Sequence, residues 1–143
     1  MITRYLLAAR RVIRDTGEND ITIVGLLEDM QMQGFPVVLP RVAVAWCVTK
    51  EPDEPGEVQG TIRTLIDAEV VNENPFTVNF QDQLTNRIIL NLAGVVIPRA
   101  GTVRLSLTLN LPGNPLTADF AFGAALTPGA PPNPNIGGTF IAA

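Results

Sequence analysis

The sequence has no histidine, and it has only one serine, one tyrosine and one lysine. Histidine is the commonest general base, the usual partner of a serine or cysteine nucleophile, and a frequent transition-metal ligand. The single serine, Ser106, lies within a stretch that alternates between apolar and polar residues, on its polar side. We therefore expect a protein that is not an enzyme and that carries neither a cofactor nor a metal ion.

Cysteine is equally scarce. Cys47 is the only one, so no disulfide can form within the chain, which fits a reducing compartment. It stands beside Trp46 in an apolar stretch, where a thiol behaves as a small hydrophobic group with a raised pKa. We expect Cys47 to be a buried structural residue.

The sequence also lacks a strongly basic character and long apolar runs. Its net charge is -4, whereas nucleic-acid binding requires a basic surface. No run of about 18 apolar residues occurs, and arginines follow the first short apolar run where a leader peptide would have its cleavage site. We expect no nucleic-acid partner, no membrane span, and a cytoplasmic protein or one that joins a particle assembled in the cytoplasm.

The clearest pattern that is present is a period of two in "TVRLSLTLN", residues 102–110. Val103, Leu105, Leu107 and Leu109 alternate with polar residues, which predicts a strand with one buried face. The turn "LPGNP" follows, and "LTADFAFGAAL" then alternates again. Two such segments around a proline-glycine turn predict a β-hairpin.

Upstream segments show the same pattern less regularly. "VVLPRVAVAWCVT" is apolar on both faces, which predicts a central strand. "DITIVGLLEDM", "EVQGTIRTLIDAEVV", "FTVNF" and "NRIILNLAGVVI" are also predicted strands, the last with a bulge at Gly94. In "EVQGTIRTLIDAEVV" the candidates for the inner face are Ile62, Ile66, Ala68 and Val70.

The first segment, residues 2–14, is compatible with two structures. At helical spacing, Ile2, Tyr5, Leu6, Ala9 and Ile13 share one face, and propensity favours a helix. The turn "DTGEN" that follows leads directly into another predicted strand, at hairpin distance. We predict a strand on the strength of this context.

About eight short strands without a clear helix are typical of a sandwich or barrel. At 143 residues the chain is expected to form one domain. We predict an all-β fold, a two-sheet antiparallel β-sandwich of the jelly-roll or immunoglobulin-like kind, over residues 1–126. Residues 127–143 are rich in proline, glycine and asparagine and are expected to form an extended C-terminal arm.

The order of these segments resembles a family of bacterial proteins that is catalogued only as a domain of unknown function. The similarity is carried by "RYLLAARRVIRDTGENDITIVGLLEDM" followed by "GFPVVLPRVAVAW", and it extends over about residues 3–125. The matching residues are Ile23, Gly25, Phe35, Pro36, Leu39 and Pro40. Where the family pattern usually has an aromatic residue in the last hairpin, this chain has Val103. The resemblance implies a compact β-sandwich in a bacterium or a bacterial virus, and it assigns no catalytic residue.

Carboxylates are the remaining candidates for chemistry. The densest cluster, in "KEPDEPGE", contains Glu51, Asp53, Glu54 and Glu57. Oxygen ligands that converge from a loop suit calcium, although prolines stiffen this loop and a solvated hairpin tip is the simpler interpretation. Asp67 and Glu69, two residues apart, are predicted to share one strand face. A monomeric module that binds a carbohydrate, calcium or lipid-type ligand through the tip loop is the alternative function.

The C-terminal arm gives the main functional hypothesis. A proline-rich segment extends by about 3.1 Å per residue and has little conformational entropy to lose on docking. It ends with three apolar residues, Ile136, Phe140 and Ile141, which are predicted to anchor it. Such an end can add a strand to a neighbour's sheet edge. We expect a homo-oligomer or a larger protein assembly, such as a shell, tail or decoration protein of a phage-like particle.

Overall fold

The structure, a computed structural model, describes residues 1–15, 17–18, 20–128 and 140–142. Within these residues every regular element is a β-strand, which confirms the all-β prediction. No helix in this part of the chain is long and apolar enough to cross a membrane. The strands are β1 (Ile2–Asp15), β2 (Asp20–Leu26), β3 (Met30–Met32), β4 (Val37–Thr49), β5 (Glu57–Ile66), β6 (Glu69–Asn79), β7 (Thr85–Ile97), β8 (Gly101–Leu109), β9 (Leu116–Leu126) and β10 (Phe140–Ala142).

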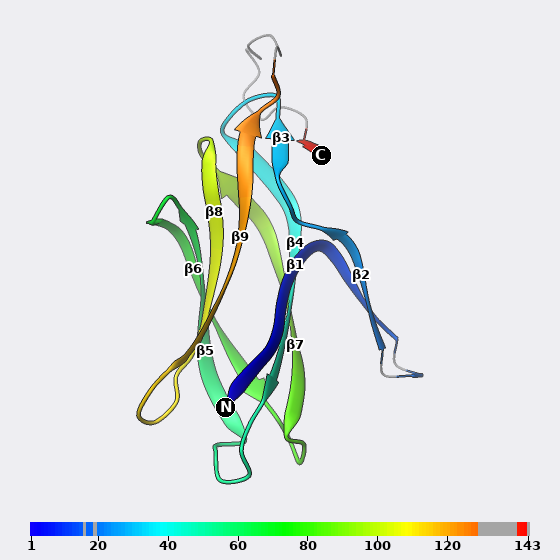
Figure 1. Cartoon of the computed structure of the whole chain (residues 1–143), viewed down its shortest axis with the longest axis vertical. Helices are drawn as coiled ribbons and strands as arrows, with labels where there is room; N and C mark the ends of the chain where they lie inside the picture. Colours follow the sequence, from blue (N-terminus) through cyan, green and yellow to red (C-terminus); the bar gives the residue numbers. More distant parts are fainter. Residues whose placement is uncertain (16, 19, 129–139, 143) are drawn as a thin grey trace.

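The strands form two sheets that pack as a sandwich (Figure 1). The four-stranded sheet has the order β2-β1-β4-β7, and the six-stranded sheet has the order β10-β3-β9-β8-β5-β6. Neighbouring strands are antiparallel except β3 and β9, which are parallel. The predicted two-sheet antiparallel sandwich is confirmed, with this one parallel pair among the described strands. β3 is reached by a crossover from the other sheet, so its direction was not set by a hairpin turn.

Residues 2–14 lie within a strand, as predicted. β1 pairs with β4 through its first half and with β2 through its second half. These two backbone ladders satisfy its hydrogen-bonding groups, so tertiary pairing overrides the helical propensity of the segment. Beyond the part that pairs with β4, β1 and β2 form a hairpin that leans away from the rest of the molecule (Figure 1).

The core lies between the two sheets, and β4 crosses it. Val42, Val44, Trp46 and Val48 are fully or almost fully buried and face the six-stranded sheet. On the opposite face of β4 the small side chains, such as Ala43, are also buried. β4 lies between β1 and β7, which confirms the prediction that it is central.

The predicted hairpin of residues 102–126 is present as β8 and β9. Val103, Leu105, Leu107 and Leu109 are completely buried, so the period of two identified the inner face correctly. This holds because a strand that borders the core on one side must alternate in this way.

The segment from Glu57 to Val71 was predicted as one strand and is in fact two. β5 ends at Ile66, and β6 begins at Glu69 after the two-residue turn Asp67–Ala68. Both turn residues have a positive φ, 47° and 79°, which is the conformation of a type I′ hairpin turn. Such turns usually contain glycine or asparagine, and this one has alanine in the second position, so its residues do not mark it as a turn.

Replacing Ala68 with glycine is expected to raise the free energy of unfolding by about 0.5–1 kcal/mol. Alanine pays a steric cost at φ 79°, and glycine does not. Urea unfolding of the two proteins measures the difference. The control is Ala121→Gly on exposed β9 backbone, where glycine brings only an entropic loss and should destabilise. A loss of stability in Ala68→Gly would contradict the argument.

Candidate functional site

The predicted C-terminal anchor lies partly within the described residues. Ile136 lies outside them, whereas Phe140 and Ile141 form β10 together with Ala142. β10 pairs antiparallel with β3, in the register Phe140↔Met32 and Ile141↔Gln31. The end of the arm therefore covers a sheet edge of its own chain through the kind of backbone pairing that was expected on a neighbour.

β3, the strand that receives β10, is fixed by the core and by the chain that follows β9. Met30 and Met32 of β3 are buried in the core, while the chain beyond β9 binds back to the same strand. The Thr127 backbone N–H and its hydroxyl both donate to the Met32 carbonyl, at 2.7 and 3.2 Å. β3 is thus held in the position where it accepts the pairing of β10, and Thr127, the first residue of the arm, lies beside it.

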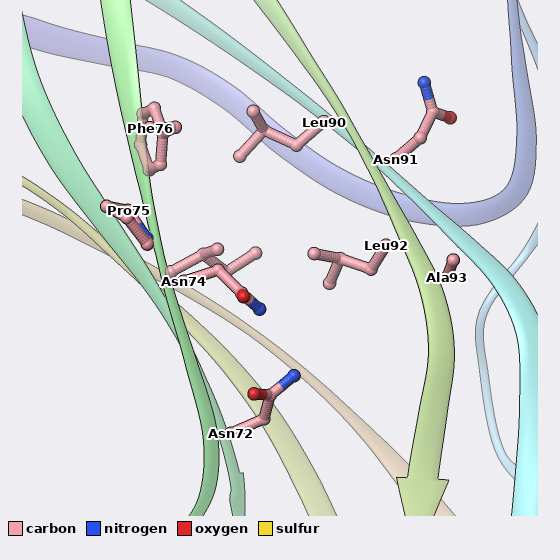
Figure 2. A pocket seen from close by; sticks show the side chains of 9 residues that line it. Asn72, Asn74, Pro75, Phe76, Leu90, Asn91, Leu92 and Ala93 are labelled. Carbon is pink, nitrogen blue, oxygen red and sulfur yellow. The ribbon is translucent and has the colours of Figure 1, made fainter.

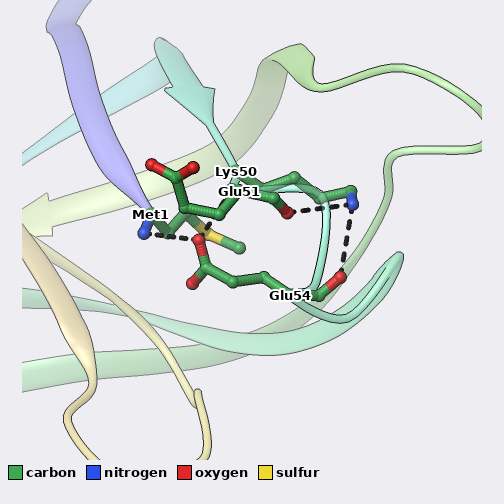
Figure 3. Close-up of polar contacts among 4 residues, drawn as sticks. All are labelled: Met1, Lys50, Glu51 and Glu54. Atoms are coloured by element: carbon green, nitrogen blue, oxygen red, sulfur yellow. Dashed lines mark hydrogen bonds and ion pairs between the residues drawn. The ribbon is translucent and has the colours of Figure 1, made fainter.

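The acidic loop between β4 and β5 is held by hydrogen bonds and an ion pair to residues of its own chain (Figure 3). The Glu54 carboxylate accepts from the Met1 amino group at 2.6 Å and from the Glu51 backbone N–H at 2.8 Å. Lys50, which is largely buried, donates its ammonium group to the carbonyls of Glu51 and Glu54. These contacts pin the loop against the start of β1.

The electrostatics of this loop reflect the same contacts. Hydrogen bonding to the Met1 amino group, reinforced by the Glu51 backbone N–H, lowers the pKa of Glu54 from its ordinary value of 4.5. Asp53 and Glu57, the other acidic residues named from the sequence, are exposed. Among the described residues, no group of three or more histidine, cysteine or acidic side chains is arranged so that it could hold a metal ion.

Asp67 and Glu69 do not form a carboxylate pair on one strand, because Asp67 lies in the turn before β6. Its carboxylate accepts from the Thr102 backbone N–H at 3.0 Å, and its own N–H donates to the Thr102 carbonyl. Glu69 is paired with the Arg99 guanidinium at 3.3 Å. The Asp67 carboxylate thus joins its own turn to the start of β8, whereas the ion pair of Glu69 is largely exposed.

A groove of about 340 Å³ opens between β6 and β7, the last strands of the two sheets on that side (Figure 2). Asn72 and Asn74 of β6 lie opposite the buried Thr64 and Ile62 of β5, so they occupy core-facing positions. Core-facing positions of a sandwich strand are normally apolar. Asn72 and Asn74 depart from that rule where they line the groove between the two sheets.

The other wall of the groove is β7. Leu90 and Leu92 lie opposite the buried Val44 and Val42, and Figure 2 shows their side chains directed toward β6. All four consecutive residues from Leu90 to Ala93 line the groove, although alternate side chains point to opposite faces. The backbone edge of β7 itself therefore borders the groove.

Sequence reasoning missed this groove. Its signal was the pair of asparagines two residues apart in "VNENPF", directly before the apolar positions Phe76 and Val78. The turn at Asp67 and Ala68 decides which residues of β6 face the core. Without that turn, the sequence does not show that Asn72 and Asn74 occupy core-facing positions.

Residues 4–114 match the model of DUF6941, a family of unknown function. The chain belongs to this family. No curated protein and no solved structure matches it.

The DUF6941 match spans β1 to β8 and ends before β9 begins at Leu116. It therefore includes the acidic loop and both walls of the groove. The strand β9, which joins β8 to β3 in the six-stranded sheet, follows the matched region. In this DUF6941 chain the acceptor strand β3 therefore lies inside the matched region, and β10 lies outside it.

Proposed function

We propose that this chain is a non-enzymatic assembly subunit whose C-terminal arm docks on a neighbouring copy or on a scaffold. The observation that carries the proposal is the pairing of β10 with β3. Backbone pairing at a sheet edge is indifferent to which chain supplies the strand, so β10 of a neighbour can make the same contacts. A shell, tail or decoration position in a phage-like particle suits such a subunit.

The composition of the arm supports exchange between copies. Residues 128–143 contain no charged side chain, and they include four prolines. A proline-rich connection resists collapse onto its own domain and loses little entropy when its end is captured elsewhere. The acidic loop, in contrast, uses Glu54 and Lys50 to hold its own conformation, which favours the assembly function over a ligand site at this loop.

The test compares the mass in solution of the full chain with that of a chain ending at Pro128, which keeps the Thr127 contacts to Met32. The core residues that the structure describes all precede Leu126, so the shorter chain keeps every one of them. We expect the full chain to form a larger oligomer than the shorter one, with both folded by circular dichroism.

A second variant isolates strand pairing from the mere presence of the arm. Ile141→Pro keeps the arm but removes a backbone donor in the middle of β10 and should lower the mass as the truncation does. Equal masses for the full chain and the truncated chain would refute the arm as an assembly element.

A further inference from the structure

The edges of the two sheets differ in how they are protected against pairing with another chain. An exposed strand edge presents unpaired N–H and C=O groups and is usually blunted by charges, prolines or irregular backbone. β6 carries Pro75 and two glutamates, and β2 carries Asp20 and a positive-φ Gly25. The edge of β3 is covered by β10.

β7 has none of these devices over its middle. Among the residues that the structure describes, it is the last strand of its sheet and pairs only with β4. From Ile88 to Ala93 it contains neither a charged residue nor a proline, and the pairing with β4 is unbroken. Its first irregularity is Gly94, with φ 68°. Six consecutive residues thus form an open edge that can accept an added strand.

The groove beside this edge is neutral throughout. No charged side chain of the described part of the chain lines it, and the polar side chains that do are asparagines. In a twofold contact a residue of one copy meets a different residue of the other, and only residues close to the axis meet their own counterparts. A neutral lining therefore places no charge against a like charge, whichever residues lie near the axis. An asparagine amide is both donor and acceptor and can therefore hydrogen-bond to a copy of itself. A contact of this composition is self-complementary.

We propose that two copies of this chain pair their β7 edges antiparallel about a twofold axis, which joins their four-stranded sheets. The Asn72 and Asn74 amides then meet the second copy across the groove, and Leu90 and Leu92 lose their remaining exposure. The proposal rests on the assembly function and adds a second contact to it. It also enlarges the contact between copies, because β10 supplies three residues and the open edge of β7 supplies six, whereas a stable interface buries roughly 1,200 Å².

The first test places a charge on the edge of the full chain. Asn91, exposed and central in β7, is replaced with lysine, and Asn110, an exposed residue after β8, receives the same substitution as the control. Light scattering across a concentration series should show that Asn91→Lys halves the mass of the assembly while Asn110→Lys leaves it unchanged. Circular dichroism verifies that both variants are folded.

The second test detects the contact directly. Asn91→Cys and Ala93→Cys, both on the outer face of β7, are oxidised mildly, with Asn110→Cys as the control. Opposite residues in an antiparallel pair have Cα atoms about 4.5–5.5 Å apart, within disulfide range. A disulfide-linked dimer from a β7 variant but not from the control supports the proposal.

The outcomes separate this proposal from that of the arm. If Asn91→Lys keeps the full mass and neither β7 cysteine cross-links, the β7 contact is refuted, whatever removal of the arm does. If Asn91→Lys halves the mass while truncation at Pro128 changes nothing, the β7 contact stands and the arm fails. A full chain that is monomeric at every concentration overturns the β7 contact and assigns the groove to another kind of ligand.

Discussion

Replacing Trp46 with alanine is expected to lower the free energy of unfolding by about 3–5 kcal/mol. Trp46 is completely buried and is the largest of the fully buried side chains. Its removal deletes apolar contacts with both sheets and leaves a cavity that the paired strands around it cannot close. A domain of this size has a total stability of about 5–15 kcal/mol, so the variant should lose a large part of it and unfold at a clearly lower denaturant concentration.

The polar end of Trp46 adds a smaller contribution. Its indole N–H donates to the Thr3 hydroxyl at 3.0 Å, which ties β4 to the start of β1. Trp46→Phe fills most of the cavity but loses this bond, and it should destabilise much less than alanine does. The comparison of the two variants divides the effect into packing and hydrogen bonding.

The measurement is denaturant unfolding followed by far-ultraviolet circular dichroism, because Trp46 is the only tryptophan and its fluorescence disappears with it. Val38→Ala, on the same strand but half-exposed, serves as the control and should change stability by less than about 1 kcal/mol. A Trp46→Ala protein within 1 kcal/mol of the original would mean that Trp46 does not pack between the sheets as described.

Replacing Gly60 with alanine is expected to destabilise the protein by about 1–2 kcal/mol, net of the entropy that alanine gains in a strand. The Phe76 ring of β6 lies across Gly60, and an added Cβ would come within 2.5 Å of it. The same Cβ would approach the Thr108 backbone carbonyl to 2.9 Å. The ring can turn, but the paired backbone of β8 cannot move without breaking its ladder.

A double-mutant cycle with Phe76→Ala tests the cause of this effect. Removal of the ring relieves one of the two obstacles, so Gly60→Ala should cost less in that background than in the original protein. Thermal or denaturant unfolding of the four proteins gives the coupling. A stabilising Gly60→Ala, or a cost that is the same in both backgrounds, would show that the ring does not occupy the space above Gly60.

Particular elements show how far the sequence could be interpreted. Residues 102–109 alternated without exception, because β8 has the core on one side only, and its buried face was predicted residue by residue. β5 and β6 were merged, because their turn at Asp67 and Ala68 contains no glycine. β3 was missed, since three residues are too few to show a period.

The candidate sites divide in a similar way. The apolar end of the arm predicted a pairing segment, and the residues Phe140 and Ile141 do pair, with an edge of their own chain. Whether a neighbour supplies or receives that strand remains a prediction. The acidic loop was visible as a cluster of charges, but the contacts of Glu54 with Met1 and of Lys50 with the loop carbonyls depend on chain segments that meet only after folding.

By itself, the sequence determined that this is an all-β chain with a buried cysteine, without histidine and with a single serine. Those properties follow from composition and from a period of two, both of which are local. Tertiary structure alone decided which strands end each sheet, and hence that β7 is left open while β3 is covered. Strand order depends on pairing between residues far apart in the chain, and local alternation carries no information about which partner a strand will have.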